Sequence, residues 1–205
     1  KSIDTRVFNA PDVTVLRAED AINDIAKTGP WRFGENHFTD FNFNNSGTWS
    51  ALPDGGKIWR IKLTCQEALT VNLTFEDLEI PQGNELYVYN EDKTFILGKF
   101  AANHIYEGQL GTELVPGNTA IVEYYVSPNN VGTGRDLTIS TVTHGYRTAG
   151  EFQEKAFGSS GNCNMNSICA PGVPWTNQIR ATVMLVSGSN GFCTGSMINN
   201  TLNDG

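Results

Sequence analysis

The sequence has little positive charge and no long apolar run. Its 14 lysines and arginines face 22 aspartates and glutamates, so the formal net charge is −8. This acidic balance argues against nucleic acid and anionic membranes as partners. No apolar run approaches the ~20 residues that a membrane-spanning helix needs. Hydrophobic residues still make up 39% of the 205 residues, which is enough for a globular core that does not depend on disulfides.

Charge is almost missing from one end of the chain. Residues 158–205 contain only Arg180 and Asp204, whereas residues 1–157 contain 34 charged side chains. Cysteine is distributed the other way, with Cys65 alone in the first part and Cys163, Cys169 and Cys193 in the second. These two shifts predict a boundary near 150–158. We therefore divide the chain into residues 1–148, a polar linker at 149–157 that is typical of protease targets, and residues 158–205.

Helical periodicity in the first part is confined to residues 18–27. Ile22, Ile25 and Ala26 share one face there, and Gly29-Pro30 supplies a stop signal. So short a helix needs packing of that face to persist.

Period-two alternation dominates the rest of the first part. In residues 57–65, for example, Trp59, Ile61 and Leu63 alternate with polar side chains. Turn signals rich in proline, glycine and asparagine separate the segments. The expected strands are residues 57–65, 69–76, 85–90, 94–97, 120–126 and 137–142. Short strands without intervening helices predict a mainly β fold, an antiparallel sandwich or jelly roll with a short amino-terminal helix.

Candidate binding residues are sparse. The histidines lie too far apart in sequence to form a metal-binding motif, so we expect hydrogen-bonded or surface side chains and no metal or other cofactor: His37, His104 and His144. The tryptophans of this part could line a glycan platform, but core positions are the more common role, above all for Trp59: Trp31, Trp49 and Trp59.

The second part contains a predicted hairpin. Residues 180–186 form one strand, 187–191 a turn and 192–198 the return strand, which carries Cys193. The three cysteines leave three alternatives open. A metal site would need a fourth ligand, a Cys163–Cys169 disulfide would leave one thiol over, and the pairing partners could lie beyond Gly205.

Several segments, taken in their order and spacing, resemble secreted bacterial lysyl-endopeptidase-like serine proteases of the Bacteroidota type. In the first part the segments resemble the propeptide of that family, and in the second they resemble the start of the mature protease. The segments are 31–34 (WRFG), 45–49 (NSGTW), 58–60 (IWR), 78–83 (LEIPQG), 86–90 (LYVYN), 144–147 (HGYR), 158–164 (GSSGNCN), Cys169, Trp175, 193–198 (CTGSMI) and 199–201 (NNT). Ala170 departs from the family, in which proline often follows the second cysteine, and Cys65 is expected to be a buried free thiol.

The resemblance implies a fold for residues 158–205, namely the first strands of a trypsin-like double β-barrel. It implies that the catalytic histidine, aspartate and serine all follow Gly205, so no catalytic residue is assigned and this chain alone is expected to be inactive. It also implies that Cys163, Cys169 and Cys193 each pair with a later cysteine.

The function implied is that of a serine endopeptidase zymogen, secreted or at the cell surface after loss of a signal peptide. Residues 1–148 would assist folding or block the active site of their own downstream protease domain, and cleavage would fall at Lys155, Ala156, Phe157 or Gly158. The mature enzyme would hydrolyse protein substrates after lysine by acyl transfer through a serine and a histidine. Two alternatives stay open: a non-catalytic β-sandwich that binds glycans or peptides, and a protease relative that has lost its triad.

Overall fold

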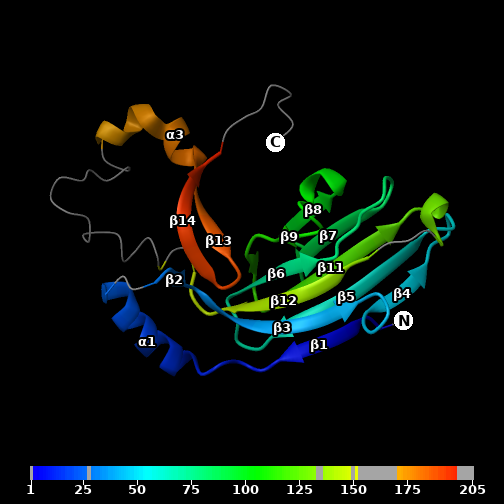
Figure 1. Ribbon diagram of the computed structural model, residues 1–205, viewed down its shortest axis with the longest axis horizontal. Helices are drawn as coiled ribbons and strands as arrows, with labels where there is room; N and C mark the ends of the chain where they lie inside the picture. The colour runs from blue at the N-terminus through cyan, green and yellow to red at the C-terminus, as the bar shows by residue number, and fades with distance from the viewer. Residues whose placement is uncertain (1, 27–28, 133–135, 149–150, 152–169, 198–205) are drawn as a thin grey trace.

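The computed structural model describes residues 2–26, 29–132, 136–148, 151 and 170–197, and the chain is mainly β (Figure 1). Among the described residues, two larger and mostly antiparallel sheets enclose the core and a small sheet lies at one end of them. The predicted β-sandwich class is therefore confirmed. No helix within the described ranges is long and apolar enough to span a membrane.

The first large sheet has the order β1-β5-β11-β7-β8, with β4 beside β5. Its strands are β1 (Asp4–Phe8), β4 (Thr48–Ala51), β5 (Lys57–Cys65), β7 (Glu85–Asn90), β8 (Ile96–Phe100) and β11 (Thr119–Val126). Within this sheet β1 runs parallel to β5.

The second large sheet has the order β10-β6-β12-β3, with β9 beside β6. Its strands are β3 (Gly34–Asn42), β6 (Thr70–Glu76), β9 (Leu110–Gly111), β10 (Val115–Pro116) and β12 (Thr138–Gly145). The helices are α1 (Val13–Ala26) and α3 (Thr176–Ala181), and the 3-10 turns are η1 (Ala102–His104), η2 (Pro128–Asn130) and η3 (Ala170–Trp175).

The core follows the predicted alternation. On β5 the side chains of Trp59, Ile61, Leu63 and Cys65 are fully buried, while the residues between them are half-buried. Burial of a large apolar side chain stabilises a fold by about 1.5–3 kcal/mol, so this face alone contributes substantially. The predicted burial of Cys65 is also confirmed, and this cysteine forms no disulfide among the described residues.

Trp59 explains a glycine in the preceding loop. Its indole nitrogen donates a hydrogen bond of 2.8 Å to the carbonyl oxygen of Ser46. Gly47 has φ of +75°, and a Cβ there would lie 2.1 Å from the same indole nitrogen. Only glycine fits this backbone and this approach. Because Trp59 is fully buried, it cannot belong to a glycan platform.

The amino-terminal helix differs from its prediction in extent and in the face it packs. It begins at Val13, five residues early, because Asp12 caps it by accepting a 3.1 Å hydrogen bond from the amide of Val15. Ile22 and Ile25, expected to pack, are 70% and 85% exposed. The expectation of an apolar packed face was wrong, since a polar face attaches α1 to the sandwich.

The strand predictions were accurate where apolar residues alternate and weaker elsewhere. β5 and β7 have the predicted bounds, whereas the strand expected at 94–97 lies at Ile96–Phe100 because Asp92 accepts hydrogen bonds from Thr94 in a turn. β3 was not predicted.

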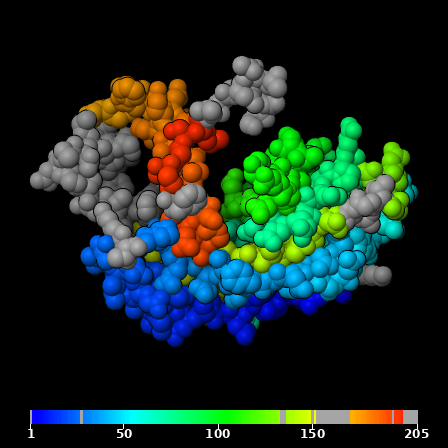
Figure 2. All heavy atoms as spheres, in the orientation of Figure 1, coloured from blue at the N-terminus to red at the C-terminus, as the bar shows by residue number. Residues whose placement is uncertain are grey.

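The small sheet has the order β13-β14-β2, from β2 (Trp31–Arg32), β13 (Thr182–Ser187) and β14 (Asn190–Ser196). The predicted hairpin is thus confirmed, although its first strand begins at Thr182 because residues 176–181 are helical, and its turn is shorter. We call β13 and β14 the carboxy-terminal hairpin. Its pairing with β2 joins residues 158–205 to residues 1–148. In Figure 2 the hairpin, orange and red, rests on the blue amino-terminal segment.

Candidate functional site: the surface that holds the carboxy-terminal hairpin

A buried carboxylate organises this surface. Asp20 of α1 is 4% exposed and accepts hydrogen bonds from Arg32 Nε at 2.9 Å and from the Tyr146 hydroxyl at 2.8 Å. Arg147 Nη1 lies 3.2 Å from the same Asp20 oxygen that accepts from Tyr146. A buried charge needs such partners, since its removal from water costs several kcal/mol. Asp20 therefore fixes α1, β2 and the segment after β12 against one another.

Arg147 is the second centre of the network. Its side chain is 2% exposed, and its guanidinium donates to Asp24 at 2.7 Å and to the carbonyl oxygen of Arg32 at 3.0 Å. The same guanidinium lies 4.8 Å from the centre of the Trp31 ring, a cation–π distance. Arg147 thus contacts both residues of β2, the ring of Trp31 and the carbonyl oxygen of Arg32.

Protonation states in the network are fixed by burial and by neighbouring charges. Burial would lower the pKa of Arg32, but hydrogen bonds to Glu19 and Asp20 outweigh it and raise that pKa. Burial, followed by the hydrogen bond to Asp20, raises the pKa of Tyr146. Arg32 therefore stays charged and Tyr146 stays a neutral donor across the physiological range.

The hairpin attaches to the strand that this network holds. Gly191 pairs with Trp31 and Asn190 with Arg32. The amides of Phe33 and Gly34 both donate to the carbonyl oxygen of Ser189 in the hairpin turn, at 2.8 and 3.3 Å.

A second contact comes from the sandwich sheet. Asn72 Nδ2 of β6 donates to the carbonyl oxygen of Gly188 at 3.3 Å, and Ser189 is only 7% exposed. The hairpin turn is therefore held against β2, β3 and β6 by backbone groups together with the side-chain amide of Asn72.

Close backbone packing supports the same surface. A Cβ on Gly34 would lie 2.8 Å from the carbonyl oxygen of His144 and 2.8 Å from Cγ2 of Thr143. Glycine at this position lets β3 approach β12 directly after β2. The segments 31–34 and 144–147, remote in sequence, thus meet at one place.

The residues singled out from the sequence have different fates. The processing residues Lys155, Ala156, Phe157 and Gly158 lie outside the described residues, as do Cys163 and Cys169. Cys193 lies on β14, where it is exposed and free. The structure tests neither the processing bond nor the pairing of these cysteines.

The histidines separate into two groups. His104 is exposed and its Nδ1 accepts a 3.0 Å hydrogen bond from the amide of Ala101. His37 and His144 come together beside Cys65, with potential ligand atoms within 4.8 Å of one another. The expectation of a hydrogen-bonded or surface side chain was wrong for His144, which is fully buried with neither ring nitrogen bonded.

Sequence reasoning missed Asp20, Tyr146 and Arg147 as interacting residues. Asp20 was placed only within the predicted helix at residues 18–27, and Tyr146 and Arg147 only within segment 144–147 of the resemblance. Their meeting depends on chain separations of more than a hundred residues.

Comparison with known proteins bears on the part of the chain that contains the hairpin. Residues 157–205 match the family model of the lysyl endopeptidase C-terminal domain. No solved structure matches the chain. The match supports a lysyl-endopeptidase-like, protease-related protein whose matched segment includes the hairpin that β2 holds.

Proposed function

We propose that residues 1–148 are the propeptide of a secreted or cell-surface serine endopeptidase, and that they hold the first hairpin of their own protease domain. One observation carries this proposal: β14, inside the segment that matches the endopeptidase family, completes a sheet with β2 of the sandwich. This pairing of strands from the two parts would attach residues 1–148 directly to the protease domain.

This attachment is compatible with both roles of a propeptide, assistance to folding and inhibition. A hairpin alone in water is marginally stable, whereas a third strand and a buried turn stabilise it. The sandwich could thus assist folding by holding β13 and β14 until the later strands pair with them. The same pairing would keep the hairpin from its mature neighbours until β2 leaves, which would block activity.

Maturation is proposed to follow cleavage at Lys155, Ala156, Phe157 or Gly158, with lysine as the residue before the cleaved bond. In the mature enzyme, a serine would attack the substrate carbonyl carbon, a histidine would take the serine proton and pass it to the leaving amine, and backbone amides would hold the oxyanion. None of His37, His104 and His144 is assigned to that chemistry.

The full-length precursor tests the proposal through its processing. Lys155→Ala and Lys155→Arg should both stop self-processing if the enzyme requires lysine, while Lys93→Ala, in an exposed turn, should mature normally. Processing would be followed by intact mass, and activity by a peptide with a single lysyl bond.

Each other outcome has its own meaning. Maturation of Lys155→Ala at the wild-type rate would rule out self-cleavage at that lysine. If Lys155→Arg matures and Lys155→Ala does not, cleavage is not strictly specific for lysine. A full-length protein that hydrolyses no peptide would favour the relative without a triad or the binding module.

A further inference from the structure

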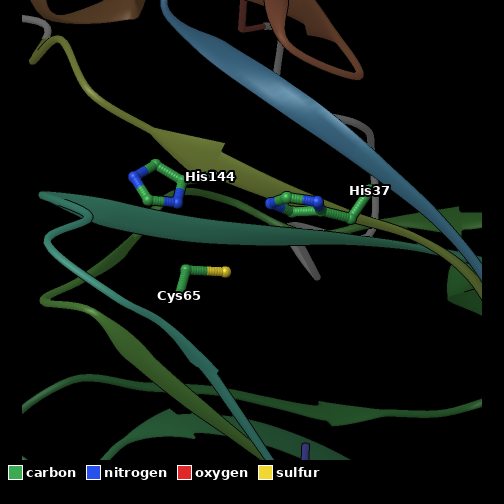
Figure 3. A group of neighbouring side chains, drawn as sticks. All are labelled: His37, Cys65 and His144. Atoms are coloured by element: carbon green, nitrogen blue, oxygen red, sulfur yellow. The ribbon is translucent and has the colours of Figure 1, made fainter. Parts of the chain in front are cut away.

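The sandwich contains a cluster of nitrogen and sulfur side chains that the proposed propeptide role does not use. His37 lies on β3 and His144 on β12, adjacent strands of one sheet, and Cys65 ends β5 of the opposite sheet. His37 pairs with Val142, two residues from His144, so both imidazoles project from the same face. Their ligand atoms and the Cys65 sulfur lie within 4.8 Å of one another (Figure 3).

Both imidazoles have buried ring nitrogens without hydrogen-bond partners among the described residues. His144 is fully buried, and neither Nδ1 nor Nε2 has a partner in the described structure. Nε2 of His37 is also buried without one. Each orphaned polar group costs about 1–3 kcal/mol, and native proteins rarely tolerate several together. A neutral imidazole offers the lone pair of one nitrogen, so the unpartnered nitrogens of the two rings, beside a buried thiol, indicate a missing ligand that accepts one electron pair from each ring.

Aromatic packing encloses the cluster on one side. The ring of His37 stacks on Phe8 of β1 with centroids 4.7 Å apart, and its edge faces His144 at 6.2 Å. This stacking fixes the ring while leaving its Nε2 directed away from solvent. In Figure 3 the imidazoles lie on one side of the cluster and the Cys65 thiol on the other.

The environment keeps both imidazoles in the form that binds metals. Burial, and then the neighbouring His37, lowers the pKa of His144 to about 4, while burial lowers the pKa of His37 against the opposing effect of Glu35. Both rings are therefore neutral near pH 7 and each offers a nitrogen lone pair. Burial raises the pKa of the Cys65 thiol to about 12, so its proton must leave when a metal binds.

We propose that His37, Cys65 and His144 bind a single zinc ion that ties the two sheets of the sandwich together. Two imidazoles and a thiolate suit zinc, whereas calcium and magnesium require oxygen ligands. Tetrahedral zinc, with bonds of about 2.1 Å to nitrogen and 2.3 Å to sulfur, places its ligand atoms about 3.5 Å apart. The cluster would close by about 1 Å around the ion, with a water molecule as the fourth ligand.

Binding is a simple exchange of a proton for a metal ion. The Cys65 S–H bond breaks, a zinc–sulfur bond forms, and the proton goes to solvent; neither partner is oxidised. The site gains one positive charge overall, which the Glu35 carboxylate beside His37 partly offsets. Zinc would join β5 of one sheet to β3 and β12 of the other.

Zinc and cobalt titrations test the site. The background is the 205-residue chain with Cys163, Cys169 and Cys193 changed to serine, so that Cys65 is the sole thiol. Metals are first removed with a chelator, and zinc is then titrated in. Native mass spectrometry should show one zinc per chain. Cobalt should give the intense absorption of a tetrahedral ion and a thiolate-to-cobalt charge-transfer band.

Matched variants separate this site from adventitious binding. Cys65→Ser should abolish the charge-transfer band and weaken zinc binding at least tenfold, whereas His104→Ala, at the exposed histidine, should bind like the background protein. Absence of stoichiometric zinc, or of the charge-transfer band in the folded background protein, would overturn the proposal. That band needs no variant, so the test stands even if Cys65→Ser fails to fold.

Discussion

Gly191 of the carboxy-terminal hairpin is paired with Trp31 of the sandwich. The Arg147 guanidinium lies over the Trp31 ring at 4.8 Å and also contacts the carboxylates of Asp20 and Asp24 on α1. One short strand therefore connects the charged network of the amino-terminal helix to the protease-like end of the chain.

Replacing Asp20 by asparagine should destabilise the chain strongly. Arg147 is buried, and loss of one carboxylate leaves its charge poorly compensated, so we expect a loss of about 3 kcal/mol in the free energy of unfolding. Urea denaturation at neutral pH measures it. Glu19→Gln is the matched control, because Glu19 binds the same Arg32 but is 53% exposed, and it should cost less than about 1 kcal/mol. Equal effects of both variants would mean that burial of the network has no energetic weight.

Gly34→Ala tests the close approach of β3 to β12. The new methyl group would meet the His144 carbonyl oxygen and Thr143 at 2.8 Å, so the strands must separate, at a cost of about 1–3 kcal/mol. Gly111→Ala supplies the comparison, since its Cβ would have no atom within 4 Å. Thermal unfolding should show a clearly lower midpoint for Gly34→Ala and little change for Gly111→Ala. A reversed order would exclude this packing.

Acid should destabilise the metal-free protein through His144. Its pKa is about 4 in the folded chain and 6.5 as a free side chain, so only the unfolded chain takes up the proton between these values. The free energy of unfolding is therefore unaffected by His144 above pH 6.5. It falls progressively as the pH drops toward 4, by about 3 kcal/mol in all.

Denaturant unfolding across that pH range, with a chelator present, measures the loss. His144→Gln should flatten the pH dependence, and His104→Gln should leave it as in the wild type. If His144→Gln loses stability with acid as steeply as the wild type, another group is responsible.

Amide exchange reports directly on the attachment of the hairpin. The Phe33 and Gly34 amides donate to the Ser189 carbonyl oxygen, so both should exchange slowly in the intact chain. Asp20→Asn should speed exchange at both, because β2 loses its support. Fast exchange at Phe33 in the wild type would show that the hairpin is not bound there.

The strands of the sandwich could be predicted where burial imposes a pattern. Apolar and polar residues alternate along β5 because one of its faces is in the core. The hairpin is predicted from two apolar runs that flank a turn rich in glycine and serine. β3 lies at a sheet edge with polar residues on both faces, so its sequence has no apolar alternation to detect.

The candidate site was beyond sequence reasoning for a different reason. Periodicity assigns Ile22 and Ile25 to the packed face of α1, yet Asp20 and Asp24 make its contacts because two arginines from elsewhere in the chain compensate them. The same holds for His37, Cys65 and His144, which three different strands bring together. Such clusters depend on strand order and register, which composition and local spacing do not encode.

The most direct test of the central claim is to cut the folded chain between its two parts. A recognition site for a specific protease, placed within residues 149–157, allows cleavage without denaturation, and size-exclusion chromatography then shows whether the pieces stay together. The two pieces should co-elute in the wild type and separate more readily in Asp20→Asn. Immediate separation of the wild-type pieces would contradict the claim that the sandwich holds the hairpin.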